Sequence, residues 1–303
     1  MDFNLIELVF TLQLEKNVAD RFALFDLKPH FEAAFMQVAH CADSTFGQCA
    51  RGDQCPYHQT FSQPLSADPT ALKRYQKPSL PFVFQIPILP PLPNQGYSVE
   101  LGLILAGSAV NFVADYIAAT ELMLLSPAFR RITTTSLLKV ESAGYGCQRQ
   151  CIMEPGQEFA AGLLATLSLQ GLLESSLLSP HTVTLTIVTP MRILIEGKAM
   201  RRFSFSPFIC SIFRRVSSLA YYYGGSEAEL NFKWLAEQSS LVECTDVAYQ
   251  WEARDSKRSG LTGRVTLQGD LTEYHPFLLA GEYLNVGKNA TFGLGRYILE
   301  IAA

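Results

Sequence analysis

Apolar and polar positions along the first half of the chain alternate between the period of a strand and the period of a helix. Residues 4–15 mix strict alternation with an apolar run rich in β-branched and aromatic residues, which indicates a half-buried strand. Residues 27–42 repeat their apolar side chains at helical spacing after Pro29, which predicts a helix. The remaining predicted elements of this half are strands at 81–89, 96–105 and 132–143 and a helix at 109–125. The order is β-α-β-β-α-β, the order of a ferredoxin-like unit.

The second half of the chain repeats this order. Strands are predicted at 181–197, 241–252, 261–268 and 296–302, and helices at 207–223 and 272–283. We therefore predict an α+β fold of two tandem ferredoxin-like (RRM-like) units, with domains at 1–150 and 151–303 and a boundary between about 145 and 180. A single larger α+β domain is the alternative. Residues 43–80 show no period and are predicted to be a long loop.

Composition and charge narrow the function. The 303 residues are 48% hydrophobic and 17% charged, which is enough apolar material for two cores. The most apolar stretch, 101–125, is interrupted by Asn111, Asp115 and Glu121, and it is too short an apolar run to predict a membrane span. The acidic start of the chain does not resemble a secretory signal, so we expect a cytoplasmic protein. The seven cysteines, an odd number, do not predict a disulfide framework.

Basic residues are clustered although the net charge is −4. The stretch between Glu196 and Glu227 contains five of them and no acid: Lys198, Arg201, Arg202, Arg214 and Arg215. A second basic group, which includes Lys257 and Arg258, falls at the predicted turn between two strands. Both groups are candidate phosphate contacts. The run Tyr221–Tyr223 at the end of the predicted helix 207–223 offers rings that stack on bases or pack in the core.

The most specific segment is GEYLNVGKNATFGLGRY, residues 281–297. Its candidate RNA-binding residues are Gly287, Lys288, Asn289, Gly293, Gly295 and Arg296. Glycines let backbone N–H groups approach a phosphate, and the two cations add charge. The spacing is that of neither a Walker loop nor a Rossmann fingerprint. A glycine-rich turn between helix and strand is the alternative interpretation.

This segment, together with FSFSPFICSIFRRVSSLAYYYGG from Phe203 and CPYHQTF from Cys55, resembles the CRISPR repeat-processing endoribonucleases of the RAMP superfamily. The resemblance implies a metal-independent ribonuclease that cleaves precursor RNA within its repeats. The ribose 2′-OH attacks the adjacent phosphate and leaves a 2′,3′-cyclic phosphate and a 5′-OH. Such chemistry needs a base, an acid and cations. The implied partners are the repeat RNA and, as alternatives left open, other CRISPR proteins or a fused domain.

The resemblance places the base on the first helix or in the loop after it. The candidate catalytic residues are His40, then His58 and Tyr57. Relatives commonly have a histidine where this chain has Asn285, so a non-catalytic RNA-binding subunit of an effector or adaptation complex is the alternative. His30, His181 and His275 are interpreted as structural.

The cysteines of the long loop are a candidate metal site. Relatives often have four cysteines in this loop, and Cys41, Cys49 and Cys55 remain here. Structural zinc prefers four ligands, and His58 is available as the fourth. Three thiols in a packed loop are the alternative. No cofactor is expected for cleavage itself.

Overall fold

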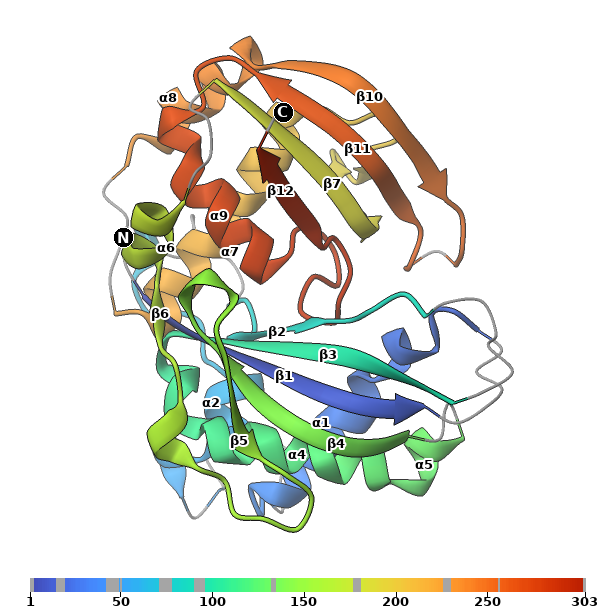
Figure 1. Cartoon of the computed structure of the whole chain (residues 1–303). Helices are drawn as coiled ribbons and strands as arrows, with labels where there is room; N and C mark the ends of the chain where they lie inside the picture. Colours follow the sequence, from blue (N-terminus) through green and yellow to red (C-terminus); the bar gives the residue numbers. More distant parts are fainter. Residues whose placement is uncertain are drawn as a thin grey trace. The chain divides into compact units, whose positions relative to one another are not determined.

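The computed structural model of the chain describes residues 3–14, 20–41, 49, 51–70, 78–89, 96–131, 135–176, 181–225, 230–255 and 257–301. The chain forms two compact units. The N-terminal unit comprises Asn4–Leu65 and Leu80–Leu167, and the C-terminal unit comprises Met1–Phe3, Ser66–Ser79 and Ser168–Ala303. Each unit has its own antiparallel sheet and its own helices (Figure 1).

The sheet of the N-terminal unit has the order β2-β3-β1-β4-β5. Its strands are β1 (Asn4–Leu14), β2 (Phe82–Gln85), β3 (Tyr97–Ala106), β4 (Thr135–Ala143) and β5 (Arg149–Met153). The central strand β1 pairs antiparallel with β3 on one side and β4 on the other. The first four strands thus have the ferredoxin-like order, and β5 extends the sheet at one edge.

Two helices cover one face of this sheet, α1 (Lys28–Val38) and α4 (Val113–Leu125) (Figure 1). Aromatic side chains fill the space between helices and sheet: the Phe31 ring meets the Phe84 ring edge-on, with centroids 4.8 Å apart, and Phe35 meets Tyr116 at the same distance. The shorter helices are α2 (Pro56–Phe61) and α5 (Pro127–Arg130). The helical pattern read from the sequence is therefore the pattern of a buried aromatic face.

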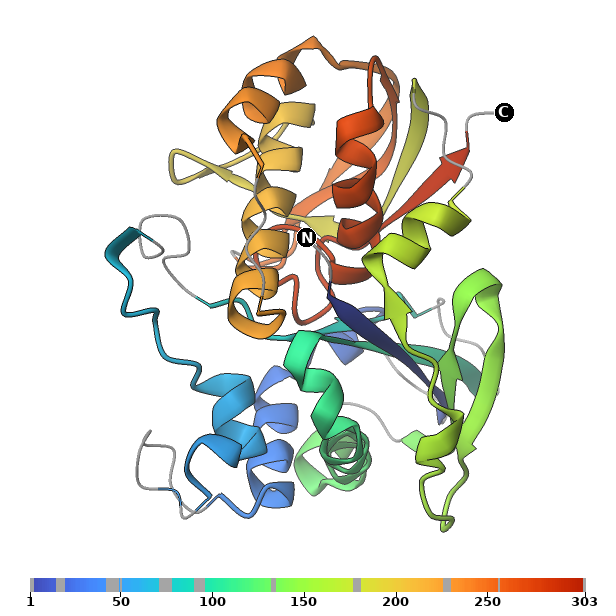
Figure 2. The same cartoon turned by 90° about the vertical axis from the view of Figure 1, so that its left-hand side faces the viewer.

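In the C-terminal unit the sheet order is β10-β11-β7-β12, again the ferredoxin-like order. Its strands are β7 (Thr182–Met191), β10 (Glu243–Glu252), β11 (Gly260–Gln268) and β12 (Tyr297–Ile301). Helices α7 (Phe205–Tyr223) and α9 (His275–Leu284) lie side by side on one face of this sheet (Figures 1 and 2). The smaller elements are α6 (Leu169–Ser175), β8 (Leu194–Ile195), β9 (Lys198–Ala199) and α8 (Phe232–Gln238). The short strand β6 (Leu167–Ser168), where the two units meet in the sequence, pairs with β1 of the N-terminal sheet.

Two tandem ferredoxin-like units with antiparallel sheets confirm the predicted fold class. The prediction of a structureless loop at 43–80 is wrong over α2, a helix of 6 residues, although residues 42–48, 50 and 71–77 lie outside the described part. Pro56 in the first turn and the apolar contacts of Tyr57 and Phe61 explain why this short helix forms. The prediction also missed β5 and α8.

Within the described part of the chain, one helix, Gly107–Leu125, is long and apolar enough to span a membrane. It consists of α4 and the 3₁₀ turn before it. Tyr116, Ala119 and Met123 on this helix are fully buried in the core of the N-terminal unit. The core accounts for their apolar character.

Candidate nucleic-acid interface and active site

The glycine-rich loop, residues 285–296, joins α9 to β12 and folds back on the end of β7. Gly287 and Gly295 have positive φ angles of 92° and 70°. A Cβ atom on Gly287 would lie 2.5 Å from the carbonyl oxygen of Arg192, and one on Gly295 would collide with the carbonyl of Val286. Only glycine combines this backbone conformation with such close approach. The two glycines are therefore needed to close the loop.

The sequence predicted that backbone N–H groups of the glycine-rich loop are available to a phosphate. In the structure these groups form hydrogen bonds within the C-terminal unit. The Gly293 N–H donates to Ala290 O at 3.2 Å, and the Gly295 N–H donates to Pro190 O at 3.1 Å. Both glycines are also buried. The expectation that Gly293 and Gly295 offer their amides to a phosphate is therefore wrong, because the fold already satisfies these amides. The Arg296 N–H donates to the Thr189 hydroxyl at 2.9 Å, and the Arg296 side chain is half-buried.

Asn285 has a structural position at the start of the loop. Its side chain is 1% exposed, its φ angle is 55°, and its Nδ2 donates to Ala290 O at 3.1 Å. With a ψ angle of 171°, Asn285 has a backbone conformation that residues other than glycine rarely adopt, and the residue ends α9 and braces the loop at the same time. A side chain buried in this way does not contact RNA.

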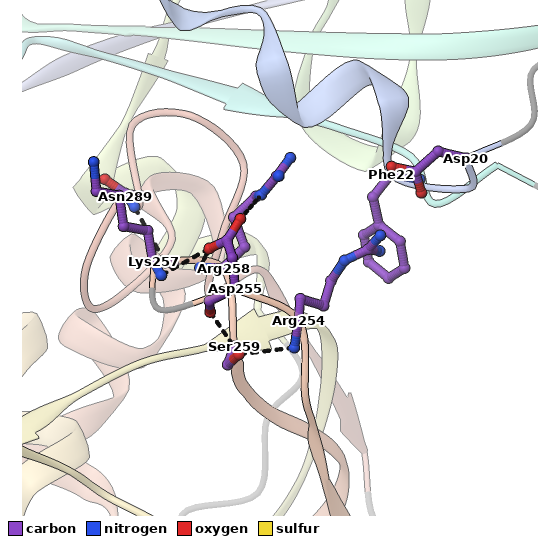
Figure 3. A network of polar contacts seen from close by, with 8 residues as sticks. All are labelled: Asp20, Phe22, Arg254, Asp255, Lys257, Arg258, Ser259 and Asn289. Carbon is purple, nitrogen blue, oxygen red and sulfur yellow. Dashed lines mark hydrogen bonds and ion pairs between the residues drawn. The ribbon is translucent and has the colours of Figure 1, made fainter.

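Lys288 and Asn289 stand at the exposed tip of the loop. The Asn289 side-chain amide donates to the backbone carbonyl of Lys257 at 3.3 Å (Figure 3). Lys257 belongs to the tip of the β10–β11 hairpin, 32 residues away in the sequence. The two basic segments that the sequence identified separately are thus neighbours.

Asp255 organises the hairpin tip (Figure 3). Its carboxylate accepts hydrogen bonds from the Lys257 N–H at 2.7 Å, from the Arg258 N–H at 2.8 Å and from Arg258 Nε at 2.6 Å. The Arg258 side chain, followed by the Lys257 N–H, lowers the pKa of Asp255 to about 2. An aspartate two residues before a turn amide is the signature of an Asx turn, a signal that was present in the sequence and was missed.

We define the basic loop surface as Arg254, Lys257, Arg258 and Lys288, with Asp255 as its one carboxylate. Lys257 and Lys288 are exposed, whereas Arg254 and Arg258 are half-exposed. Four cations outweigh a single ionised carboxylate, so the surface attracts a polyanion despite the net charge of the chain.

Arg201 lies near the tip of the same hairpin. Its guanidinium carbon stands 3.8 Å from the centroid of the Trp251 ring in β10, and this cation–π contact orients the arginine. Arg202 is exposed beside it. Trp251 was not among the predicted site residues, although an aromatic side chain next to basic residues is a usual feature of RNA-binding surfaces.

The two neighbouring arginines of α7 differ in their surroundings. Arg214 is exposed, as predicted for a phosphate contact. Arg215 points inward, where its Nε donates to Leu284 O at 2.7 Å and its guanidinium approaches the Thr291 hydroxyl at 3.5 Å. Burial lowers the pKa of Arg215 to about 10. Arg215 is half-buried and holds the end of α9 against the glycine-rich loop, and its role as an RNA contact stays a prediction.

The tyrosine run at the end of α7 holds another segment of the chain. The Tyr221 hydroxyl lies 2.7 Å from the Ser66 hydroxyl, and the Ser66 N–H donates to the Tyr222 hydroxyl at 3.3 Å. Tyr223 is buried, which raises the pKa of its hydroxyl. Of the two interpretations of this run, packing is the one for which the structure shows contacts.

In the N-terminal unit, His40 follows the end of α1. It has a φ angle of 49° and an exposed side chain. The Cys41 N–H donates to Met36 O at 3.1 Å, and the His40 N–H donates to Gln37 O at 3.1 Å. This is a Schellman motif with His40 in the left-handed position, where histidine is tolerated. The backbone thus fixes the position from which the imidazole projects into solvent.

The other two candidate catalytic residues are buried. His58 is 3% exposed and Tyr57 is 4% exposed. The Tyr57 ring packs on Phe61, and burial, followed by the charge of Glu32, raises the pKa of its hydroxyl. Both side chains are therefore shielded from solvent in this structure. His58 instead joins Cys41, Cys49 and Cys55 in a cluster whose ligand atoms all lie within 4.8 Å of one another.

Two protein-family models match the chain, one in each half. Residues 185–297 match the family model described as CRISPR-associated endoribonuclease Cas6, and residues 4–164 match a model described as an N-terminal domain. The C-terminal unit is therefore similar to the Cas6 family. The match to the N-terminal-domain model spans more than half of the chain, and no curated protein matches the sequence.

Solved Cas6 structures share the fold. Thermus thermophilus Cas6 is 16% identical, with a TM-score of 0.52 and coverage of 98% of this chain and 99% of that one. A Cas6 product complex has a TM-score of 0.56 at 16% identity and covers 98% of this chain and 100% of the other. A partial Cas6-RT-Cas1–Cas2 complex has a TM-score of 0.59 at 15% identity and covers 99% of this chain. The present chain spans about half of that longer protein, 46% of its length.

Proposed function

We propose that this chain is an endoribonuclease that cleaves CRISPR precursor RNA within its repeats. The observation that carries the proposal is the hydrogen bond between Asn289 and Lys257, because it joins the glycine-rich loop and the hairpin tip into the basic loop surface. A surface of clustered cations with few acids binds phosphates. The match of residues 185–297 to the Cas6 family model and the fold shared with a Cas6 product complex support RNA as the substrate.

The cleavage step that we propose is an internal transesterification. A base takes the proton of the ribose 2′-OH, the 2′-oxygen attacks the adjacent phosphorus, and the P–O5′ bond breaks as the 5′-oxygen receives a proton. The products are a 2′,3′-cyclic phosphate and a 5′-OH, and no water is consumed. Cations stabilise the additional negative charge of the phosphorane, so the reaction needs no catalytic metal.

His40 is the residue that we assign to proton transfer. Imidazole is the side chain that accepts and donates protons near neutral pH, and that of His40 is exposed. The buried positions of His58 and Tyr57 favour neither as a group that contacts the substrate. The remaining candidates, Lys288, Lys257, Arg258, Arg201, Arg202 and Arg214, are assigned to RNA binding.

Cleavage of the cognate repeat RNA in EDTA tests this function. We expect a single cut per repeat, at a fixed position, with a 3′ product that is a substrate for kinase labelling at its 5′-OH. The 5′ product should resist periodate until its cyclic phosphate is removed, because the 2′,3′-diol is blocked. Cleavage that requires added Mg²⁺, or products with a free 3′-OH and a 5′-phosphate, would refute the proposed chemistry.

The alternative, an RNA-binding subunit without catalytic activity, rested on Asn285 in place of a histidine. Asn285 is buried and bonded to the loop backbone, so a proton shuttle at this position would not reach an RNA in this structure. The substitution therefore does not argue against catalysis.

Partners and location follow from the same proposal. Because similar chains occur in a Cas6-RT-Cas1–Cas2 complex, we propose other CRISPR proteins, or a domain fused to this one, as partners besides the repeat RNA. A cytoplasmic location is consistent with such partners and stays a prediction. Co-purification with reverse transcriptase, Cas1 and Cas2 components encoded nearby tests the assembly.

A further inference from the structure

We infer that Cys41, Cys49, Cys55 and His58 bind one zinc ion that clamps the end of α1 to the start of α2. The four ligand atoms lie within 4.8 Å of one another, and none of the three cysteines is in a disulfide bond. The Cys41 Sγ and His58 Nε2 are 3.5 Å apart. In a tetrahedral site with Zn–S near 2.3 Å and Zn–N near 2.0 Å, neighbouring ligand atoms are also roughly 3.5 Å apart.

The donor set and its burial point to zinc among the biological metals. Three thiolates and one imidazole are soft ligands, which suit Zn²⁺ and disfavour Mg²⁺ or Ca²⁺. Cys41, Cys55 and His58 are at most 5% exposed, while Cys49 is half-buried. Four protein ligands leave no open coordination position. The site is therefore structural rather than catalytic.

Local structure brings the ligands together from different elements. Cys55 is the N-cap of α2 and His58 lies one turn further along, so a single helical turn presents two ligands. Cys41 follows the Schellman motif at the end of α1. Cys49 precedes a turn in which the Gly52 N–H donates to Cys49 O at 2.9 Å. A metal ion would tie these segments together in addition to the ring contacts of Phe61 with Phe31 and Phe35, which already join α2 to α1.

The site also affects the proposed catalytic residue. His40 is directly bonded to Cys41, and its left-handed backbone conformation is set by the motif that ends α1. A metal bond to Cys41 would hold this motif and thereby position the His40 imidazole. This consequence rests on the proposed function, whereas metal binding itself does not. A role as a metal ligand would also explain why the His58 side chain is buried.

Metal content tests the site independently of RNA cleavage. The full chain is expressed with added zinc, dialysed under reducing conditions and analysed by mass spectrometry for metals. We expect about one zinc ion per chain. Cys49→Ser should lower the content several-fold, and His58→Cys should retain it because a four-thiolate site also binds zinc. The control, Cys244→Ser, changes a half-buried thiol in the C-terminal unit and should leave the zinc content unchanged.

A second measurement covers the case in which a ligand variant does not fold. Cobalt added to metal-free wild-type protein should give the intense visible bands of tetrahedral cobalt with thiolate charge transfer. Wild-type protein that takes up neither zinc nor cobalt, or Cys49→Ser with full zinc content, would overturn the inference. Zinc measured before and after the EDTA cleavage assay separates the two proposals, since loss of cleavage with zinc retained would count against the catalytic proposal only.

Discussion

The side-chain amide of Asn289 donates to the backbone carbonyl of Lys257 at 3.3 Å and so joins two loops that are distant in sequence. The bond places the tip of the glycine-rich loop beside the tip of the β10–β11 hairpin (Figure 3). Neither loop alone carries more than a few cations. Their juxtaposition makes the basic loop surface, and each tip depends on its own internal bonds for shape.

Removing this bond should weaken RNA binding without changing its salt dependence. Asn289 has a φ angle of 60°, a conformation that glycine adopts without strain. Asn289→Gly therefore deletes the side-chain amide and preserves the backbone conformation. An exposed hydrogen bond contributes roughly 0.5–1 kcal/mol, so we expect affinity for repeat RNA to fall about 2- to 5-fold. Because no charge is lost, the slope of log K against log salt should stay constant. A changed slope would show that Asn289 acts through ion contacts instead.

Lys288→Ala should also weaken RNA binding, but through the loss of a positive charge. Each phosphate contact to single-stranded RNA contributes about 0.7 to the salt slope, so the slope should fall by about that amount. The loss of affinity should be similar for the cognate repeat and for a scrambled RNA, because a phosphate contact reads no sequence. Lys233→Ala, an exposed lysine of α8, is the matched control and should leave both quantities unaltered. An unaltered slope for Lys288→Ala would limit the loop to a structural turn.

Substitutions of the two neighbouring arginines of α7 should separate an effect on protein stability from an effect on RNA binding. Arg215→Met removes the donor to Leu284 O and leaves that buried carbonyl without its partner, at a cost of about 1–3 kcal/mol. We expect the melting temperature to fall clearly in thermal unfolding. Arg214→Met changes an exposed side chain and should leave the melting temperature nearly constant while it lowers RNA affinity. Equal stability of the two variants would contradict the role given to Arg215.

The lowered pKa of Asp255 predicts the pH range in which the hairpin tip keeps its hydrogen bonds to this carboxylate. Its pKa in the folded protein is about 2, below the value of about 3.9 for an unperturbed aspartate. Its contribution is therefore fully present above pH 4 and is lost as the pH falls through about 2. The amide signals of Lys257 and Arg258 should titrate with a midpoint near 2 in nuclear magnetic resonance spectra, and Asp255→Asn should abolish this titration. A midpoint near 3.9 in folded protein would argue against the ion pair with Arg258.

Most helices and strands could be predicted from the sequence, because the side chains that repeat at a helical or strand period are the ones buried in the core. Residues 207–223 were predicted as a helix that the structure shows as Phe205–Tyr223, and the predicted strand at 4–15 is Asn4–Leu14. The short α2 was missed, since six residues give too little periodicity to stand out among cysteines and prolines. Tertiary contacts with the aromatic core determine that helix.

The candidate site was predicted less completely, for a different reason. Adjacent residues of a helix point about 100° apart, so the pair Arg214 and Arg215 gave no indication of which one faces inward. A glycine pattern fits both close packing and phosphate binding, and only the hydrogen bonds of Gly293 and Gly295 distinguish the two. The contact between Asn289 and Lys257 depends on the topology of the sheet and has no local signal.

His40 is tested best by a variant that keeps its backbone conformation. Its φ angle of 49° makes alanine a poor choice, whereas asparagine is among the residues most often found in this region. His40→Asn should lower the single-turnover cleavage rate on the order of 10²- to 10⁴-fold, the range for a general acid or base, while affinity for the RNA stays nearly constant. His30→Asn is the matched control on the same helix, since the His30 ring contacts Phe129 at 5.8 Å and is interpreted as structural. Cleavage by His40→Asn at the wild-type rate would exclude His40 from proton transfer, because the variant removes the imidazole and retains the end of α1.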